Sequence, residues 1–247
     1  MIKIDLHMHC GDDPYDGLRY TAVQLVDKAV ELGYGAIAIT LHEKVIEDER
    51  VYEYARNKGL LLIRAVEWNI LGRDVLLYNI TQHDAERLLS FEDLRAYRRE
   101  RGDELLVVAP HAFYPRGHSL GREFERNIDV FDAVEIAQIH LPWFDWFNQR
   151  AISVAKKHGK PMIANSDAHN LWMFGRHYTL VEAEPTQTSI FAAIRKGNVQ
   201  PVSPPITVRE CFRMFFSEPL LLRRQGEVLE SFPAQNTPPT ASDRAHP

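Results

Sequence analysis

Short, nearly continuous apolar runs alternate along the chain with longer stretches in which apolar residues recur every three or four positions. A continuous apolar run bounded by turn residues is typical of a buried strand, and the wider spacing is typical of an amphipathic helix. The pattern predicts strands over residues 2–8, 36–41, 60–66, 74–80, 105–109, 132–139, 161–165 and 177–183. It predicts helices over residues 21–33, 47–58, 90–101, 144–158, 188–196 and 207–224, with residues 114–126 as a long loop or short helix.

This alternation of strands and helices determines the expected fold class. A βαβα order argues for an α/β protein with a parallel sheet, and a chain of 247 residues suits a closed or nearly closed barrel. No break in composition divides residues 1–224, so we expect one domain there. Residues 225–247 are rich in Pro, Ser and Thr and poor in apolar residues, which predicts a disordered tail.

Composition narrows the setting in which the protein works. The formal net charge is −5, which gives no general reason to expect nucleic-acid binding. At most, short oligonucleotides are expected as nucleic-acid partners. The two cysteines, Cys10 and Cys211, form no disulfide framework and fit a reducing compartment. We find no signal peptide and no apolar run of membrane-spanning length, so a cytoplasmic protein that does not enter membranes is expected.

Histidine and acidic residues stand at the end of one predicted strand after another. His7 and His9 share a face of the first strand, because side chains alternate along a strand. In a parallel barrel the carboxyl ends of the strands surround one mouth, where active sites form. The residues predicted to meet there are His7, His9, His42, Glu67, His111, His140, Asp167 and His169.

The residue types in this set predict a metal site. Imidazole and carboxylate ligands without a thiolate cluster suit zinc, manganese or iron, and a carboxylate can bridge two ions. The set holds more ligands than one four-coordinate ion uses, so two or three divalent ions are expected. Such clusters lower the pKa of a bound water and hold the oxygens of a displacement, which favours hydrolysis of phosphate esters.

Over residues 2–200 the motifs resemble those of the PHP (polymerase and histidinol phosphatase) family of metal-dependent phosphoesterases. The sequence DLHMH at residues 5–9 resembles the first family motif, and AITLH at 38–42 resembles the second, usually Thr-Asp-His. VEW at 66–68, APH at 109–111 and NSDAH at 165–169 are similar to the bridging-Glu, strand-end His and last motifs. The resemblance implies a distorted, TIM-like (β/α)7 barrel with up to three metal ions.

The resemblance also implies a role for each candidate ligand. Glu67 would bridge the first ion to a second ion that His111 also holds. Asp16 is our choice for the acidic ligand of the third ion, and Asp13 is its rival because the loop after His9 is longer than usual. The first ion would be bound by His7, His9, Glu67 and Asp167, and the third by Asp16, His42 and His169.

Two departures from the family pattern affect these expectations. Leu41 replaces the Asp of Thr-Asp-His, a residue that is not expected to be a ligand. The family often has a second-metal His on the strand after the bridging Glu, where residues 74–80 offer Tyr78 and Asn79 instead. The second site would then be weaker or completed by His140, or else by His83, and a two-metal site is an alternative.

The expected substrate is a small phosphorylated metabolite or a nucleotide. Arg116 and Arg122 lie in the loop after His111, and either guanidinium would suit bidentate binding of a phosphate. His140 would serve as general acid for the leaving group if it is not a ligand. The alternatives are a barrel that hydrolyses another bond, such as an amide, or a metal-binding domain without catalysis.

Overall fold

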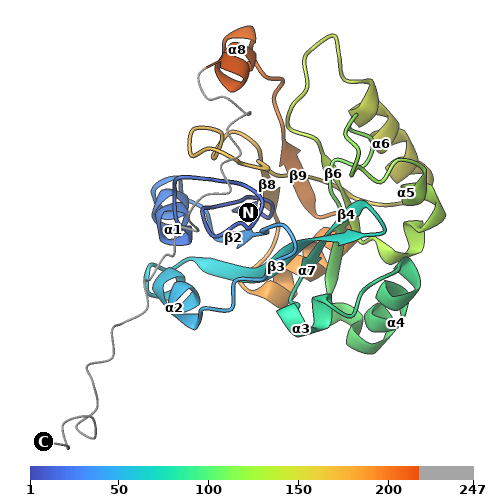
Figure 1. The fold of residues 1–247 in the computed structure, drawn as a ribbon, viewed down its shortest axis with the longest axis horizontal. Helices are drawn as coiled ribbons and strands as arrows, with labels where there is room; N and C mark the ends of the chain where they lie inside the picture. Colours follow the sequence, from blue (N-terminus) through green and yellow to red (C-terminus); the bar gives the residue numbers. More distant parts are fainter. Residues whose placement is uncertain (217–247) are drawn as a thin grey trace, which may run out of the picture.

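The computed structural model describes residues 1–216, which form a curved sheet with helices around it (Figure 1). Its strands are β1 (Ile2–Asp5), β2 (Ala36–Ile39), β3 (Leu61–Ile70), β4 (Arg73–Tyr78), β5 (Leu106–Ala109), β6 (Ala133–Ile136), β7 (Met162–Ala164), β8 (Tyr178–Val181) and β9 (Val199–Val202). Its helices are α1 (Ala22–Glu31), α2 (Glu49–Asn57), α3 (Gln82–Ala85), α4 (Phe91–Arg101), α5 (Arg122–Arg126), α6 (Trp146–Lys157), α7 (Gln187–Lys196) and α8 (Val208–Phe216). The end of the helix predicted over 207–224 and the tail predicted over 225–247 lie outside the described residues.

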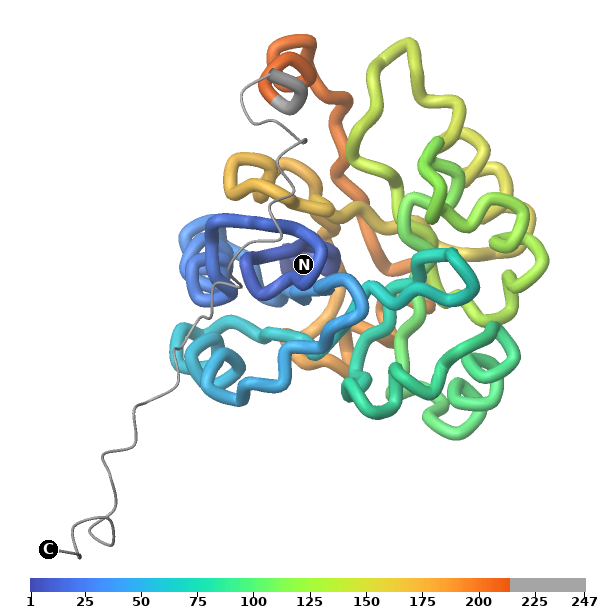
Figure 2. Tube along the Cα trace, viewed as in Figure 1, coloured from blue at the N-terminus to red at the C-terminus, as the bar shows by residue number. Residues whose placement is uncertain are grey.

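The nine strands form one sheet in the order β7-β6-β5-β4-β3-β2-β1-β8-β9, and this sheet curves into a nearly closed barrel. The Thr179 hydroxyl on β8 accepts a hydrogen bond from the Ala164 N–H on β7 and donates one to the Ala164 carbonyl, both at 2.8 Å. The first strand lies beside β8, which is more than 170 residues away along the chain (Figure 2). The predicted α/β barrel is therefore confirmed.

The expectation of an entirely parallel sheet is wrong at two strands. β4 runs antiparallel to β3 and β5, and β8 runs antiparallel to β1 and β9. Only Leu71 and Gly72 separate β3 from β4, with φ values of 53° and 79°. A turn this short makes a hairpin, whereas a parallel pair needs a crossover of a dozen or more residues.

β9 was not expected, because its sequence VQPV contains a proline and a polar residue and resembles a loop. It pairs with β8 at one end of the sheet order, where a strand tolerates a proline. Since β9 is antiparallel to β8, it runs in the same direction as β1, β2, β3, β5, β6 and β7. These strands all finish at one end of the barrel, which we call the mouth.

Helices cover the outside of the sheet and close the end opposite the mouth. α1 and α2 pack over one half of the barrel, and α4, α5 and α6 pack over the other (Figure 1). Ile190, Phe191 and Ile194 of α7 pack into the same core as the inward side chains of the strands. The first helix is capped, since Thr21 Oγ1 accepts the Gln24 N–H at 3.3 Å and Gln24 Oε1 accepts the Thr21 N–H at 2.8 Å.

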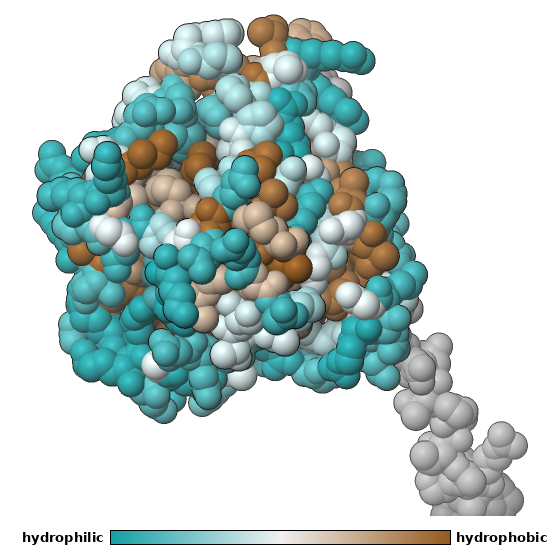
Figure 3. Space-filling model, turned by 180° about the vertical axis from the view of Figure 1, so that it is seen from behind, coloured by the Kyte–Doolittle hydropathy of each residue, from teal (hydrophilic) through white to brown (hydrophobic). Residues whose placement is uncertain are grey.

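Seen from the side opposite to Figure 1, apolar residues gather towards the middle of the face and polar ones dominate its edges (Figure 3). Among the residues that the structure describes, no helix combines the length and apolar character needed to cross a membrane.

Candidate metal centre

The strand ends and loops at the mouth bring the candidate ligands into one cluster. His7 and His9 follow β1, His42 follows β2, Glu67 lies within β3, and His111 follows β5. Asp167 and His169 follow β7, and Asp16 comes from the loop before α1. A bridge between Met8 and Ala168 holds the first and last of these segments together, and a bridge between His42 and Glu67 joins two others.

Glu67 occupies the middle of the cluster and turns its two oxygens towards different imidazoles. Its Oε2 lies 3.2 Å from His7 Nε2, 3.4 Å from His9 Nε2 and 3.4 Å from His42 Nε2. Its Oε1 lies 3.3 Å from His111 Nε2. A carboxylate that faces two ligand groups in this way has the arrangement of a bridge between two ions.

Asp167 completes the group around His7 and His9. Its Oδ1 lies 3.4 Å from the Nε2 atoms of both histidines, which are 3.3 Å from each other. Two ligands of a tetrahedral zinc ion, each about 2.1 Å from the metal, are about 3.4 Å apart. The spacing of His7, His9, Glu67 and Asp167 therefore fits one ion.

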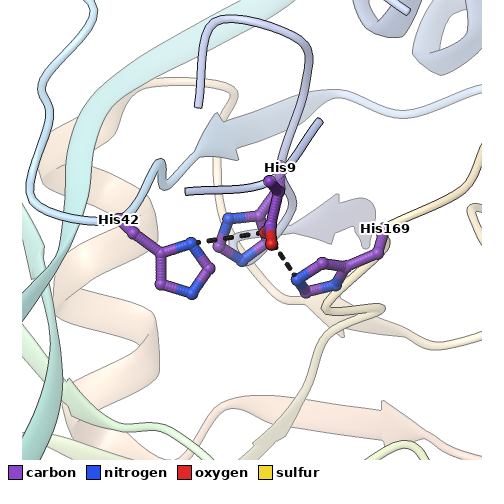
Figure 4. A group of neighbouring side chains, drawn as sticks. His9, His42 and His169 are labelled. Atoms are coloured by element: carbon purple, nitrogen blue, oxygen red, sulfur yellow. Dashed lines mark ion pairs between the residues drawn. The ribbon is translucent and has the colours of Figure 1, made fainter. Parts of the chain in front are cut away.

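A second group lies on the outer side of His9. His9, Asp16, His42 and His169 have potential ligand atoms within 4.8 Å of one another, and the three imidazoles face a common point (Figure 4). Asp16 Oδ2 lies 3.0 Å from His169 Nε2 and 3.4 Å from His42 Nδ1. This oxygen is buried, and apart from these two imidazole nitrogens it has no partner among the described residues, as expected of an atom that faces a cation.

The rival loop residue, Asp13, lies deeper and contacts the rings from behind. Its Oδ2 accepts the His42 N–H at 2.8 Å and lies 3.1 Å from His9 Nδ1 and 3.0 Å from His42 Nδ1. Its Oδ1 accepts the N–H groups of Tyr15 and Asp16. Asp13 therefore orients the two imidazoles and the loop. Of the two aspartates, Asp16 is the one better placed to act as a metal ligand.

The third group contains a residue that the sequence did not single out. Asp74, at the start of β4, has a ligand atom within 4.8 Å of those of Glu67 and His111. Burial and the negative charge of Glu67 raise the pKa of Asp74 above its usual value. Because β4 is antiparallel, its beginning lies at the mouth. Tyr78 and Asn79 are at its other end, where Tyr78 donates to the Leu6 carbonyl and Asn79 to the Glu104 carbonyl.

Glu135 is another functional residue that sequence reasoning missed. It is completely buried in β6, with Oε2 at 2.9 Å from His7 Nδ1 and from the Asn165 amide nitrogen. Its Oε1 accepts the His111 N–H at 3.3 Å. A carboxylate on the far nitrogen of an imidazole fixes the tautomer and makes the other nitrogen a better ligand. The signal was present in the sequence, since Glu135 interrupts the apolar strand AVEI.

At His7, Glu67 and Asp167 burial disfavours charge, but neighbouring opposite charges outweigh it. The carboxylates of Glu135, Glu67 and Asp167 raise the pKa of His7 well above its usual value despite burial. The imidazole of His7 in turn helps to lower the pKa values of Glu67 and Asp167 well below their usual range, again against burial. Glu67 and Asp167 therefore keep their negative charge at neutral pH, and a cation would be attracted to them.

The remaining candidates lie apart from these groups. His140 is buried, with Nδ1 at 3.1 Å from the Ala137 carbonyl and its ring 6.5 Å from that of His177. Arg116 and Arg122 are exposed, and Arg116 lies over the Tyr114 ring at 5.3 Å. Among the described residues, no ion pair joins either arginine to the metal-ligand candidates.

Comparison with known proteins supports the resemblance seen in the motifs. A family model described as PHP-associated matches residues 145–199, and no curated protein matches the sequence. A two-domain protein from Bacteroides vulgatus that contains a predicted PHP-like metal-dependent phosphoesterase has a similar fold, with a TM-score of 0.62 and 18% identity. That comparison covers 81% of this chain and 64% of the other, so this chain spans less than two thirds of that protein.

Two further solved structures share the fold. The lesion-specific endonuclease PfuEndoQ from Pyrococcus furiosus has a TM-score of 0.55 and 16% identity, over 93% of this chain and 69% of that one. An amidohydrolase from Chromobacterium violaceum has a TM-score of 0.50 and 13% identity, over 80% of this chain and 97% of that one. The resemblance to the PHP family is confirmed, and these similarities show the fold of the chain.

Proposed function

We propose that this protein is a metal-dependent phosphoesterase that hydrolyses a small phosphorylated metabolite or a nucleotide. The observation that carries the proposal is Glu67, whose two oxygens face separate imidazole groups across one buried carboxylate. This arrangement supports two neighbouring divalent ions, and the outer group supports a third. Bound zinc, manganese or iron ions would supply a water of lowered pKa and would neutralise the phosphoryl oxygens.

The chain's own side chains have separate parts in this proposal. The first ion would be held by His7, His9, Glu67 and Asp167. The second would be held by Glu67, Asp74 and His111. The third would be held by Asp16, His42 and His169, and His9 lies close to it. Glu135 and Asp13 hold imidazoles by their far nitrogens, so that the near nitrogens face the ions.

We retain His140 as the proposed general acid. Its Nδ1 lies against the Ala137 carbonyl, and no hydrogen bond between described residues engages its Nε2. That nitrogen is therefore the one that would donate a proton to the leaving oxygen. Arg116 and Arg122 stay proposed phosphate-binding residues on the loop after His111, and a bound phosphate would have to draw them inwards.

The test combines metal analysis with hydrolysis of a generic aryl phosphate in the presence of Mn²⁺ or Zn²⁺. We expect two or three ions per chain in protein purified without chelators, and a sharp fall in the Glu67→Ala variant. We also expect hydrolysis that His7→Ala reduces by at least about a thousandfold, which corresponds to about 4 kcal/mol of lost transition-state stabilisation. Equal rates in wild type and His7→Ala, or a metal content unaffected by Glu67→Ala, would refute the proposal.

The same assay separates the proposal from its alternatives. PfuEndoQ is an endonuclease and the C. violaceum protein an amidohydrolase, so short oligonucleotides and N-acyl amides are the informative additional substrates. Metal-dependent turnover of an amide alone would favour the amide-hydrolysing reading. Bound metal without turnover of any of these substrates would favour a metal-binding domain without catalysis.

A further inference from the structure

The loop after β5 carries an exposed histidine, His118, close to the residues proposed to hold the second ion. β5 ends at the mouth and β4 begins there, and the Asp74 N–H at the start of β4 donates to the His118 carbonyl at 3.0 Å. The next residue in the loop, Ser119, is buried, and its Oγ lies 3.5 Å from Nδ1 of His111. The loop at His118 is therefore in contact with two candidate ligands of that ion.

Contacts to its main chain hold this loop against the start of β4. Nη1 of Arg73 donates to the carbonyls of Gly117 at 2.8 Å and of Ser119 at 2.7 Å. With the bond from the Asp74 N–H, three consecutive carbonyls of the loop accept hydrogen bonds from the first two residues of β4. A substitution at position 118 keeps these bonds, because they involve no side chain of the loop.

The imidazole of His118 is oriented by Asn69 of β3. Asn69 Oδ1 accepts the Gly72 N–H at 2.9 Å, and Asn69 Nδ2 donates to Asp74 Oδ1 at 3.0 Å, so both ends of the amide are assigned by their partners. The same Nδ2 lies 3.5 Å from His118 Nδ1. Since an amide nitrogen only donates, Nδ1 is the accepting nitrogen of the ring and the proton is on Nε2. Among the described residues, no hydrogen bond or ion pair engages this Nε2–H.

We propose that His118 is a substrate-binding residue whose Nε2–H donates a hydrogen bond to an oxygen of the substrate's phosphoryl group, on the side of Asp74. The inference rests on the proposed function. Phosphoryl oxygens accept hydrogen bonds, and bonds to such charged acceptors are stronger than those between neutral groups. Nε2 carries its proton whether the imidazole is neutral or charged, so the role does not depend on the titration of the ring. Unlike the exposed Arg116 and Arg122, this donor is already held in place by Asn69.

The experiment measures the binding of inorganic phosphate to the metal-loaded protein by calorimetry. We expect His118→Ala to weaken phosphate binding by about tenfold, as the loss of one hydrogen bond to a charged group should. His118→Gln should restore most of the affinity, because its side-chain amide supplies a donor at a similar distance from the backbone. His158→Ala is the matched control, because this exposed histidine follows α6 at the end of the barrel opposite the mouth.

Metal titration of the same proteins separates substrate binding from an indirect effect through Asp74. Among the described residues, His118 is in none of the groups that could hold an ion, so all three variants should bind as many ions as wild type, with the same affinities. Loss of an ion in His118→Ala would mean that the histidine acts on Asp74 or is itself a ligand, and would overturn the inference. Thermal unfolding should be unchanged, because the main-chain bonds of the loop remain.

Hydrolysis distinguishes a failure of this inference from a failure of the proposed function. If the protein hydrolyses an aryl phosphate, His118→Ala should raise KM by about tenfold and change kcat little, because the bond is made to bound substrate and transition state alike. Phosphate binding that depends on His118, in a protein that hydrolyses no phosphate ester, would refute the proposed function alone. Hydrolysis with the same KM and the same phosphate affinity in wild type and His118→Ala would refute the role of His118 alone. Wild-type protein that binds no phosphate would overturn the inference as well.

Discussion

Buried carboxylates occur at both ends of the barrel, but their partners differ. At the end opposite the mouth, Asp132 accepts hydrogen bonds from both terminal nitrogens of Arg98, from Arg195 Nε at 3.1 Å and from the Val107 N–H at 2.9 Å. At the mouth, Glu67, Glu135 and Asp167 contact imidazoles and amides. Among the described residues, no lysine or arginine forms an ion pair with these three carboxylates.

This difference indicates what each end is built to hold. A buried carboxylate is costly unless a positive charge and hydrogen bonds compensate for it. Asp132 has permanent cations that belong to the chain, so that end of the barrel is complete by itself. Among the described residues, the groups near the carboxylates at the mouth that can carry a positive charge are histidines, which compensate when they are protonated or when a cation binds between them. The mouth therefore has the electrostatics of a site for external cations.

The Asp132 cluster should show the largest effect on folding. Asp132→Asn leaves two guanidinium groups without their buried partner, and we expect a loss of about 3 kcal/mol in the free energy of unfolding. The measurement is urea denaturation at pH 7, together with metal content, which should stay the same. Asp103→Asn is the matched control, because the Asp103 side chain is fully exposed, 3.8 Å from Arg195, and its loss should have almost no effect.

The stability difference between wild type and Asp132→Asn should depend on pH, and the sign of this dependence follows from the pKa of Asp132. Burial opposes the charge of Asp132, but Arg98 and the other donors outweigh it and lower the pKa of this carboxyl. Its contribution to stability is therefore present above the ordinary aspartate pKa of about 3.9 and is lost as the pH falls through the lowered value. The difference between wild type and Asp132→Asn should shrink below about pH 4. A constant difference down to pH 2 would contradict this account.

Metal removal tests the other half of the comparison. We expect chelation to lower the free energy of unfolding by about 2.7 kcal/mol relative to protein at a free ion concentration of about one hundred times Kd. The chelated protein should keep its fold, because imidazole protonation then compensates for part of the buried charge. The check is denaturation with and without chelator in wild type and Glu67→Ala, and the variant should show a smaller difference between the two conditions.

Glu135 should have a smaller effect, confined to metal affinity. Glu135→Gln removes the charge that holds His7 Nδ1, and loss of such a partner weakens metal binding by about tenfold to a hundredfold. Competition with a fluorescent chelator measures the change. Glu125→Gln changes a residue that pairs with Lys157 at the surface and should leave the affinity unaltered. Equal affinities in wild type and Glu135→Gln would mean that this carboxylate does not orient the ligand.

The difference between the two ends also explains what the sequence revealed. The strand ends carry His7, His9, His42 and Asp167 next to apolar runs, so local pattern and barrel geometry were enough to bring them together. Glu135 escaped notice because a single acid within a strand has the same local pattern whether it faces solvent or a buried imidazole. β9 was not predicted because its pairing with β8 makes it a strand, and no local sequence pattern reports that pairing.

Asp74 shows how strand direction decides a functional residue. A parallel β4 would have presented Tyr78 and Asn79 at the mouth, and the antiparallel strand presents Asp74 there instead. The Asn69 amide fixes its carboxylate at 3.0 Å, within reach of Glu67 and His111. We expect Asp74→Ala to weaken one of the bound ions by about tenfold, or about 1.4 kcal/mol, and to leave the others unchanged.

Calorimetric titration of metal into chelated protein would resolve the ion that Asp74 affects. Asp74→His supplies a ligand of the kind that the PHP motif pattern leads one to expect after the bridging glutamate, and it should restore the affinity or raise it. Thermal unfolding of both chelated variants would show whether the loss of the Asn69 contact matters for folding. Identical titrations of wild type and Asp74→Ala would mean that Glu67 and His111 hold their ion without this strand, and that the site of the second ion is no more complete than the sequence indicated.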